Sequence, residues 1–280
     1  MDTNLFFYEK LKSLIADNVL KLKGDEIDQL YSFWATNIEK PTLKNLLLPS
    51  SVIHANQQVA DQSTLKGVDL PSWFGNINNP KIVVLGIDPL REKNDFIRSD
   101  CHDYDSNVLI GTPYAFHEKA ARDGYCRSYW TLVDGLVKAE RFVYCTDIFK
   151  TYYYNKKKSL RSYLDQEFIK NKNHRDLLMK ELNLIKPDFI IVFGKMAHEL
   201  LFRSRCPKIG QNVQITKKKF ELNDRSVEVY TVLHLSKTPR GAAFKTFFTA
   251  NDLSQQDVNY ENRVQCAELY LELLKKQGVC

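Results

Sequence analysis

The sequence predicts an α/β protein with three α-β-α layers around a central, mostly parallel four-stranded sheet, and an N-terminal helical extension. Two observations predict this class: four short β-branched or aliphatic runs, and helical patterns between them. The runs cover residues 81–86, 141–145, 188–193 and 229–233. Each is too short for a helix, and strands that alternate with helices are typical of a parallel sheet covered on both faces.

The first fifty residues are predicted to be helical. Apolar side chains recur at helical spacing in two runs, separated by Gly24 and Asp25. We therefore expect an N-terminal helical extension over residues 1–50 and one α/β domain over residues 51–280. Within that domain we expect a long loop over residues 90–111 and a hairpin over residues 213–229.

Composition excludes several classes of protein. The chain has 280 residues, 44% of them hydrophobic, and no apolar run approaches the ~20 residues that span a bilayer. Its six cysteines are dispersed without a Cys-x-x-Cys pair, which argues against a disulfide framework, a zinc ribbon or an iron–sulfur site. We expect a reduced, cytoplasmic monomer that does not bind membranes. The net charge of +6 favours a nucleic-acid partner.

Polar or flexible residues follow each predicted strand. These residues are Asp88, Asp147, Gly194 and His234. Because the carboxyl ends of parallel strands share one edge of a sheet, we expect these four positions to converge on a single crevice, where open α/β sheets bind their ligands.

Four motifs in this order resemble those of the uracil-DNA glycosylase superfamily. They are Gly86-Ile87-Asp88-Pro89, Thr146-Asp147-Ile148-Phe149-Lys150, the Pro187–Ala197 stretch with its Gly-Lys-x-Ala ending, and His234-Leu235-Ser236. The resemblance covers about residues 70 to 275. It implies an enzyme that flips a nucleotide out of DNA and hydrolyses its N-glycosidic bond, without a metal or other cofactor.

The resemblance also implies roles for individual residues. Asp88 would stabilise positive charge on the sugar and orient the attacking water, and His234 would stabilise the departing base. Asp147 would read the base, and Phe116, with Tyr114 as the second choice, would stack on it.

Further residues are expected to contact DNA. Ser236 would bind a backbone phosphate, and Arg240 would fill the hole left in the duplex or bind a phosphate. Lys150, Lys156 and Lys237 would add cationic contacts whose affinity fades with salt. A lyase activity would need a lysine nucleophile, and nothing singles out Lys237 for that role.

The chain departs from the family pattern at the base-reading position. Asp147 stands where uracil-specific relatives carry Asn, and His-Leu-Ser replaces His-Pro-Ser. A carboxylate accepts hydrogen bonds but does not donate to O4 of uracil, and it suits the exocyclic amine of cytosine. We therefore expect a modified cytosine as substrate, such as the glucosylated 5-hydroxymethylcytosine of phage DNA, and a role in anti-phage defence.

Other readings stay open at this point. Asp147 could instead pair with a nearby Lys or Arg and leave the base to another group. The protein could be a uracil-DNA glycosylase of base-excision repair, which Asp147 argues against. It could also be a non-catalytic nucleic-acid-binding module, which the intact Asp88 and His234 argue against. An unrelated flavodoxin-like enzyme is the weakest alternative, because the sequence has no Gly-rich phosphate loop.

Overall fold

A computed structural model of the chain describes residues 3–40, 46–54, 63–87, 106–155, 160–161, 172–206, 215–236, 240–253 and 257–280. The chain divides into two compact units. The first comprises residues 1–72, 87–120 and 146–185, and the second comprises residues 73–86, 121–145 and 186–280. No described helix is long and apolar enough to cross a membrane.

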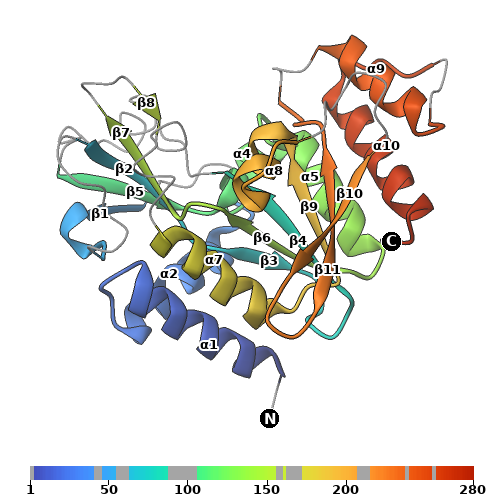
Figure 1. Cartoon of the computed structure of the whole chain (residues 1–280). Coiled ribbons are helices and arrows are strands. Elements are labelled where there is room, and N and C mark those ends of the chain that lie inside the picture. Colours follow the sequence, from blue (N-terminus) through green and yellow to red (C-terminus); the bar gives the residue numbers. More distant parts are fainter. Residues whose placement is uncertain are drawn as a thin grey trace. The chain divides into compact units, whose positions relative to one another are not determined.

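The second unit holds a six-stranded sheet with strand order β10-β11-β9-β4-β6-β3 (Figure 1). Its strands are β3 (Ser72–Phe74), β4 (Lys81–Gly86), β6 (Phe142–Asp147), β9 (Phe189–Phe193), β10 (Thr216–Glu221) and β11 (Ser226–Val232). The β4–β9 and β9–β11 pairs are parallel, and β10 is antiparallel to β11. All four predicted strands are present as neighbours, in the order β6-β4-β9-β11.

Two details of the predicted sheet were wrong. The central sheet has six strands rather than four, because the short edge strands β3 and β10 extend it. In addition, the predicted hairpin and the predicted fourth strand are not separate elements. The second arm of the hairpin is β11 itself, which starts at Ser226 and pairs with β10 from Glu221 back to Thr216.

The second unit also contains helices, one of which packs on β9 and β11. They are α5 (Arg127–Lys138), α8 (Gly194–Phe202), α9 (Gly241–Ala250) and α10 (Arg263–Lys276), preceded by the short α4 (Lys119–Asp123) that begins in the first unit. The α5 and α10 helices lie side by side (Figure 1). Their contact is so close that a Cβ added at Gly135 would lie 2.2 Å from a Leu271 methyl carbon. Glycine at this position therefore allows the two helices to approach each other.

The first unit contains a five-stranded sheet that the sequence did not predict. Its order is β1-β5-β2-β7-β8, with β1 (Leu46–Pro49), β2 (Ser63–Asp69), β5 (Asn107–Gly111), β7 (Thr151–Asn155) and β8 (Leu160–Arg161). Short 3-10 helices cover Ser50–Val52 and Pro113–Ala115. The end of the expected 90–111 loop is therefore strand β5, and residues 88–105 lie outside the described part of the chain.

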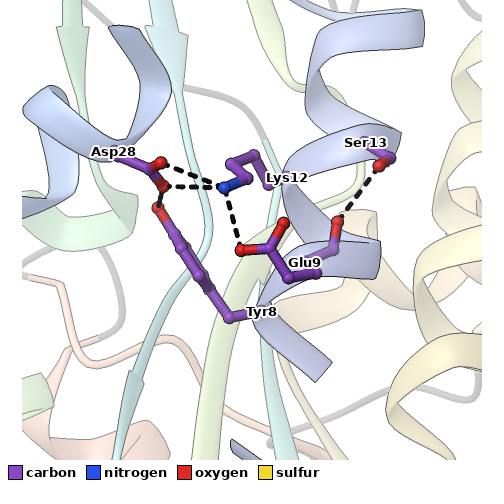
Figure 2. Close-up of polar contacts among 5 residues, drawn as sticks. All are labelled: Tyr8, Glu9, Lys12, Ser13 and Asp28. Atoms are coloured by element: carbon purple, nitrogen blue, oxygen red, sulfur yellow. Dashed lines mark hydrogen bonds and ion pairs between the residues drawn. The ribbon is translucent and has the colours of Figure 1, made fainter. Parts of the chain in front are cut away.

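Helices α1 (Thr3–Asn18), α2 (Gly24–Asn37) and α7 (Lys172–Ile185) belong to the first unit, and α1 packs on both of the others. The two predicted N-terminal helices are thus confirmed. A polar cluster joins α1 to α2 (Figure 2): the Asp28 carboxylate accepts from the Tyr8 hydroxyl at 2.7 Å and from the Lys12 ammonium at 3.0 Å. The Tyr8 hydroxyl and Lys12 hold the pKa of Asp28 below its usual range. The domain boundary near residue 50 stays a prediction.

Candidate active site

The carboxyl ends of β9 and β11 lie at the same edge of the sheet. Their parallel register sets Phe193 opposite Val232, so the residues that follow both strands come out together. Gly194 has a φ of +83°, and a Cβ added there would lie 3.6 Å from the Cβ of His234. The predicted proximity of Gly194 and His234 is confirmed. Convergence of all four strand ends on one crevice stays a prediction.

The imidazole of His234 is fixed from two sides. The Tyr129 hydroxyl of α5 lies 2.6 Å from Nδ1, and its distance to Nε2 is 3.4 Å. The backbone N–H of Ser236 also donates to Nδ1, at 3.2 Å. Because a backbone N–H can only donate, Nδ1 carries no proton, and the Tyr129 hydroxyl must act as the second donor. The much shorter Nδ1 distance makes this the principal contact of the hydroxyl.

Burial determines the charge of the imidazole. It lowers the pKa of His234 to about 4, so the ring is neutral at neutral pH. A neutral ring with a bare Nδ1 carries its single proton on Nε2. The side chain is therefore a neutral hydrogen-bond donor, which can stabilise negative charge that develops on a leaving group.

Helices hold the loop that follows β11. The guanidinium of Arg263 donates from Nε to the carbonyl of Ser236 at 3.0 Å, and the hydroxyl of Tyr270 donates to the carbonyl of Leu233 at 3.0 Å. The Ser128 hydroxyl donates to the carbonyl of Leu235 at 3.4 Å. The His-Leu-Ser segment is thus braced by both α5 and α10.

A second group of candidate residues lies in the first unit, in the turn between β6 and β7. Asp147 is the last residue of β6 and is buried. The N–H of Phe149 donates to the carbonyl of Ile87 at 2.9 Å, so this turn is tied to the residue just before Asp88. Asp88 itself lies outside the described residues, as do Lys156 and Lys237.

The placement of Lys150 does not fit its expected role as a surface contact to DNA phosphate. Its side chain is buried, and its ammonium forms an ion pair with Glu181 of α7 at 2.5 Å. The ammonium also donates to the Thr146 hydroxyl and, at 2.7 Å, to the carbonyl of Asp147. The ammonium is thus engaged by two hydrogen-bond acceptors and by the Glu181 carboxylate inside the protein.

The candidate stacking residues occupy a strained turn after β5. Tyr114 and Ala115 both have left-handed backbone conformations, with φ of +57° and +51°. Such a conformation costs about 1–2 kcal/mol per non-glycine residue. The Thr112 hydroxyl stabilises the turn, because it accepts from the His117 N–H at 3.2 Å and bonds the His117 ring at 3.0 Å. The rings of Tyr114 and Phe116 have centroids 5.4 Å apart, with Phe116 fully buried and Tyr114 half-buried.

The two remaining candidates for DNA contact lie in the second unit. Ser236 is half-buried beside His234, and Arg240 is exposed at the start of α9. An exposed guanidinium at this place is available to a phosphate, whereas the Ser236 backbone is already bonded to His234 and Arg263. Among the residues that the structure describes, no group of three or more His, Cys, Asp and Glu side chains is placed to hold a metal.

Sequence reasoning missed the residues that position the candidates. Tyr129, Arg263 and Glu181 lie on helices, outside the four motifs. One of them left a signal in the sequence: Glu181 lies on the apolar face of α7 with Leu177, Leu178, Leu182 and Ile185. A carboxylate on such a face needs a buried partner.

A comparison with protein-family models matches residues 72–249 to the uracil DNA glycosylase superfamily. The matched range contains β4, β6, β9 and β11, together with Asp147 and His234. A search of curated proteins found no match. Because the family model covers well over half of the chain, and because the motif-bearing strands follow one another as the motifs require, the protein belongs to the uracil-DNA glycosylase superfamily.

Proposed function

We propose that the protein is a monofunctional DNA glycosylase that flips out and excises a modified pyrimidine. Family membership supports glycosylase chemistry on DNA. The favoured substrate is a modified cytosine, such as glucosylated 5-hydroxymethylcytosine of phage DNA. The observation that carries this choice is the carboxylate at the base-reading position, Asp147, together with the engagement of Lys150 by other groups.

The reaction breaks the bond between C1′ of the sugar and N1 of the base, and water adds to C1′. Positive charge develops on the sugar and negative charge on the base. We assign Asp88 to the sugar cation and the attacking water. We assign the Nε2–H of His234 to O2 of the departing pyrimidine, where a neutral donor stabilises the developing anion. Because uracil and cytosine both carry O2, this contact does not distinguish the two bases.

Discrimination is assigned to Asp147. Its carboxylate would accept a hydrogen bond from N4 of a cytosine, whereas O4 of uracil would present lone pairs to it. A Lys150 donor on the carboxylate would weaken this preference, but the described partners of the ammonium are the Thr146 hydroxyl, the Asp147 carbonyl and Glu181. Lys150, the cation nearest in the sequence, is thus held by these other groups, which supports the proposal that Asp147 reads an amine. Since a host genome contains ordinary cytosine, a modified base is the substrate compatible with survival.

The remaining roles follow from exposure. Tyr114 is the better-placed ring for a flipped base because it is half-buried, whereas Phe116, whose ring centroid is 5.4 Å away, is fully buried. Base–aromatic stacking is worth about 1–3 kcal/mol per base. Ser236 and Arg240 are proposed to contact the DNA backbone, and Lys156 and Lys237 to add cationic attraction.

The test uses oligonucleotides that carry one uracil, cytosine, 5-hydroxymethylcytosine or glucosylated 5-hydroxymethylcytosine, with alkali to cleave abasic sites. We expect cleavage at a modified cytosine and little at uracil. The variant Asp88→Asn is expected to be inactive. The variant Asp147→Asn is expected to lose activity on the modified cytosine and to gain activity on uracil. Efficient cutting of uracil by the unmodified protein would contradict this choice of substrate and support the alternative, a uracil-DNA glycosylase of base-excision repair. Binding without cleavage of any base would indicate a non-catalytic module.

A further inference from the structure

A buried ionic cluster lies beneath the base-reading turn. Lys150 and Glu181 are exposed by only 3% and 1%, and their charged groups are 2.5 Å apart. The hydroxyl of Thr146 donates to the other Glu181 oxygen at 2.7 Å. Taking an ion pair out of water is costly, and replacing such a pair with apolar side chains is often neutral or stabilising. Fold stability alone therefore does not explain why two charges are placed here.

The cluster is connected to the two segments that carry the proposed chemistry. The Lys150 ammonium donates to the carbonyl of Asp147 at 2.7 Å, which fixes the backbone of the proposed base reader. One residue earlier, the N–H of Phe149 donates to the carbonyl of Ile87, next to the proposed catalytic Asp88. The same short turn thus holds both carbonyls, and Glu181 anchors it to helix α7.

A buried histidine of α7 lies beside the base-reading turn. His174, about two turns before Glu181 on the same face of α7, packs edge-on against Phe149 with ring centroids 5.3 Å apart. Burial, and then the charge of Lys150, lowers the pKa of His174 to about 4. The imidazole is therefore neutral at neutral pH and adds no second positive charge beside Lys150.

We propose that Glu181, through Lys150 and Thr146, is a positioning residue that fixes the backbone of Asp147 and the turn that holds the Ile87 carbonyl. Glu181 lies on helix α7, outside the four motifs, so the motifs do not assign it any role. The inference rests on the proposed function for the identity of the base, but the positioning itself can be measured separately.

The main perturbation keeps the fold and removes the brace. In the double variant Lys150→Met with Glu181→Leu, both charges are replaced by apolar side chains of similar size. We expect a melting temperature near that of the unmodified protein, unchanged affinity for DNA, and a loss of kcat of at least about tenfold, which corresponds to ~1.4 kcal/mol of transition-state stabilisation. The preference for modified cytosine over uracil should fall as well. A matched control removes the exposed pair of Lys186 and Asp224, and should change none of these values.

A second pair of variants tests the proposal independently, in case the double variant does not fold. Thr146→Val keeps the shape of the side chain and deletes the hydroxyl, whereas Thr146→Ser keeps the hydroxyl. We expect the Val variant to behave like the double variant and the Ser variant like the unmodified protein. If the double variant and Thr146→Val are both folded with full kcat and full base preference, the cluster is structural and the proposal is wrong.

An independent readout separates this proposal from the proposed function. Amide hydrogen exchange at Phe149 reports the bond to Ile87 whether or not any base is cut. We expect protection of this amide to fall at least about tenfold in Thr146→Val, with the amide of Leu182 on α7 unchanged. Unchanged protection at Phe149 would overturn the positioning role. Uracil excision combined with lost Phe149 protection would overturn only the choice of substrate.

Discussion

Removal of the Tyr129 hydroxyl should disturb His234 without moving it. In Tyr129→Phe the ring still packs edge-on against the imidazole, at a centroid distance of 5.5 Å, but the 2.6 Å bond to Nδ1 is lost. The Ser236 N–H remains as the other donor. A net loss of about 1–1.5 kcal/mol is expected for one such hydrogen bond. Because the lost donor stabilised the unprotonated Nδ1, the loss favours both the protonated ring and the wrong tautomer.

Two measured quantities follow from this magnitude. One pKa unit corresponds to ~1.36 kcal/mol, so the pKa of His234 should rise by about one unit from its value of about 4. The acid limb of the single-turnover rate against pH should move up by the same amount. At neutral pH the rate should fall about five- to tenfold.

The control for this experiment is Tyr270→Phe. It deletes a hydroxyl that is bonded to the Leu233 carbonyl of the same loop but does not touch the imidazole. It should lower the melting temperature and leave the acid limb in place. If Tyr129→Phe keeps the rate and acid limb of the unmodified protein, the hydroxyl does not stabilise the unprotonated Nδ1 and this assignment of Tyr129 is wrong.

Three further predictions concern stability and DNA binding. Gly75→Ala should destabilise the fold severely, as measured by chemical denaturation, because φ is +87° and the new Cβ would lie 2.4 Å from the Arg141 carbonyl oxygen. Buried His174 and His234 have folded-state pKa values of about 4, below the ordinary 6.5, so their contribution to stability is complete above pH 6.5 and is lost as the pH falls towards 4. Denaturation at pH 5 should show a loss of about 2 kcal/mol for each, and a flat profile would contradict their neutral burial. Arg240→Gln should reduce the slope of log affinity against log salt by about one, and an unchanged slope would remove Arg240 from the phosphate contacts.

The motif-bearing half of the fold was predictable because its strands are fully buried. The runs ending at Gly86 and Phe193 are nearly continuous β-branched or aliphatic sequences, and only a strand of a covered sheet uses such a run at that length. Their order in the sheet follows from chain connectivity and parallel pairing. The hairpin was misdivided because β11 is exposed at its first residue, Ser226, and fully buried over its last four residues.

The five-stranded sheet was not predictable by the same reasoning. Strand β2 has the sequence STLKGVD, with an irregularity in its register between Leu65 and Gly67 that interrupts the alternation of polar and apolar residues. Strand β7 is tyrosine-rich rather than aliphatic, and β5 has only five residues. These strands pair with partners far away in the sequence, so no local pattern marks them.

At the candidate site, the motifs predict candidate reacting groups but not the residues that hold them. His234 just after β11 and Asp147 at the end of β6 stand where the strand pattern predicts chemistry. The motifs themselves do not indicate that Tyr129 contacts His234 or that Glu181 lies beneath Asp147. For Lys150, the motif predicted a role in DNA contact that its buried position does not fit. A lysine in a motif next to a basic segment suggests a phosphate contact, yet its partner on α7 makes it an internal cation. The charge of a side chain can be read from the sequence, whereas its environment depends on which helix packs over it.

The residues around a motif therefore determine the charge and the tautomer of its histidine. A histidine in a His-x-Ser motif can be a cation, a donor from Nε2 or a donor from Nδ1, and only the second form matches the donor required at a departing pyrimidine oxygen. In this protein burial excludes the cation, and the Tyr129 hydroxyl with the Ser236 N–H excludes a proton on Nδ1. A relative with the same motif but with Phe at the position of Tyr129 would have one of these two restraints fewer. Substrate range in such relatives should therefore follow the helix residues that face the motifs, as well as the motifs themselves.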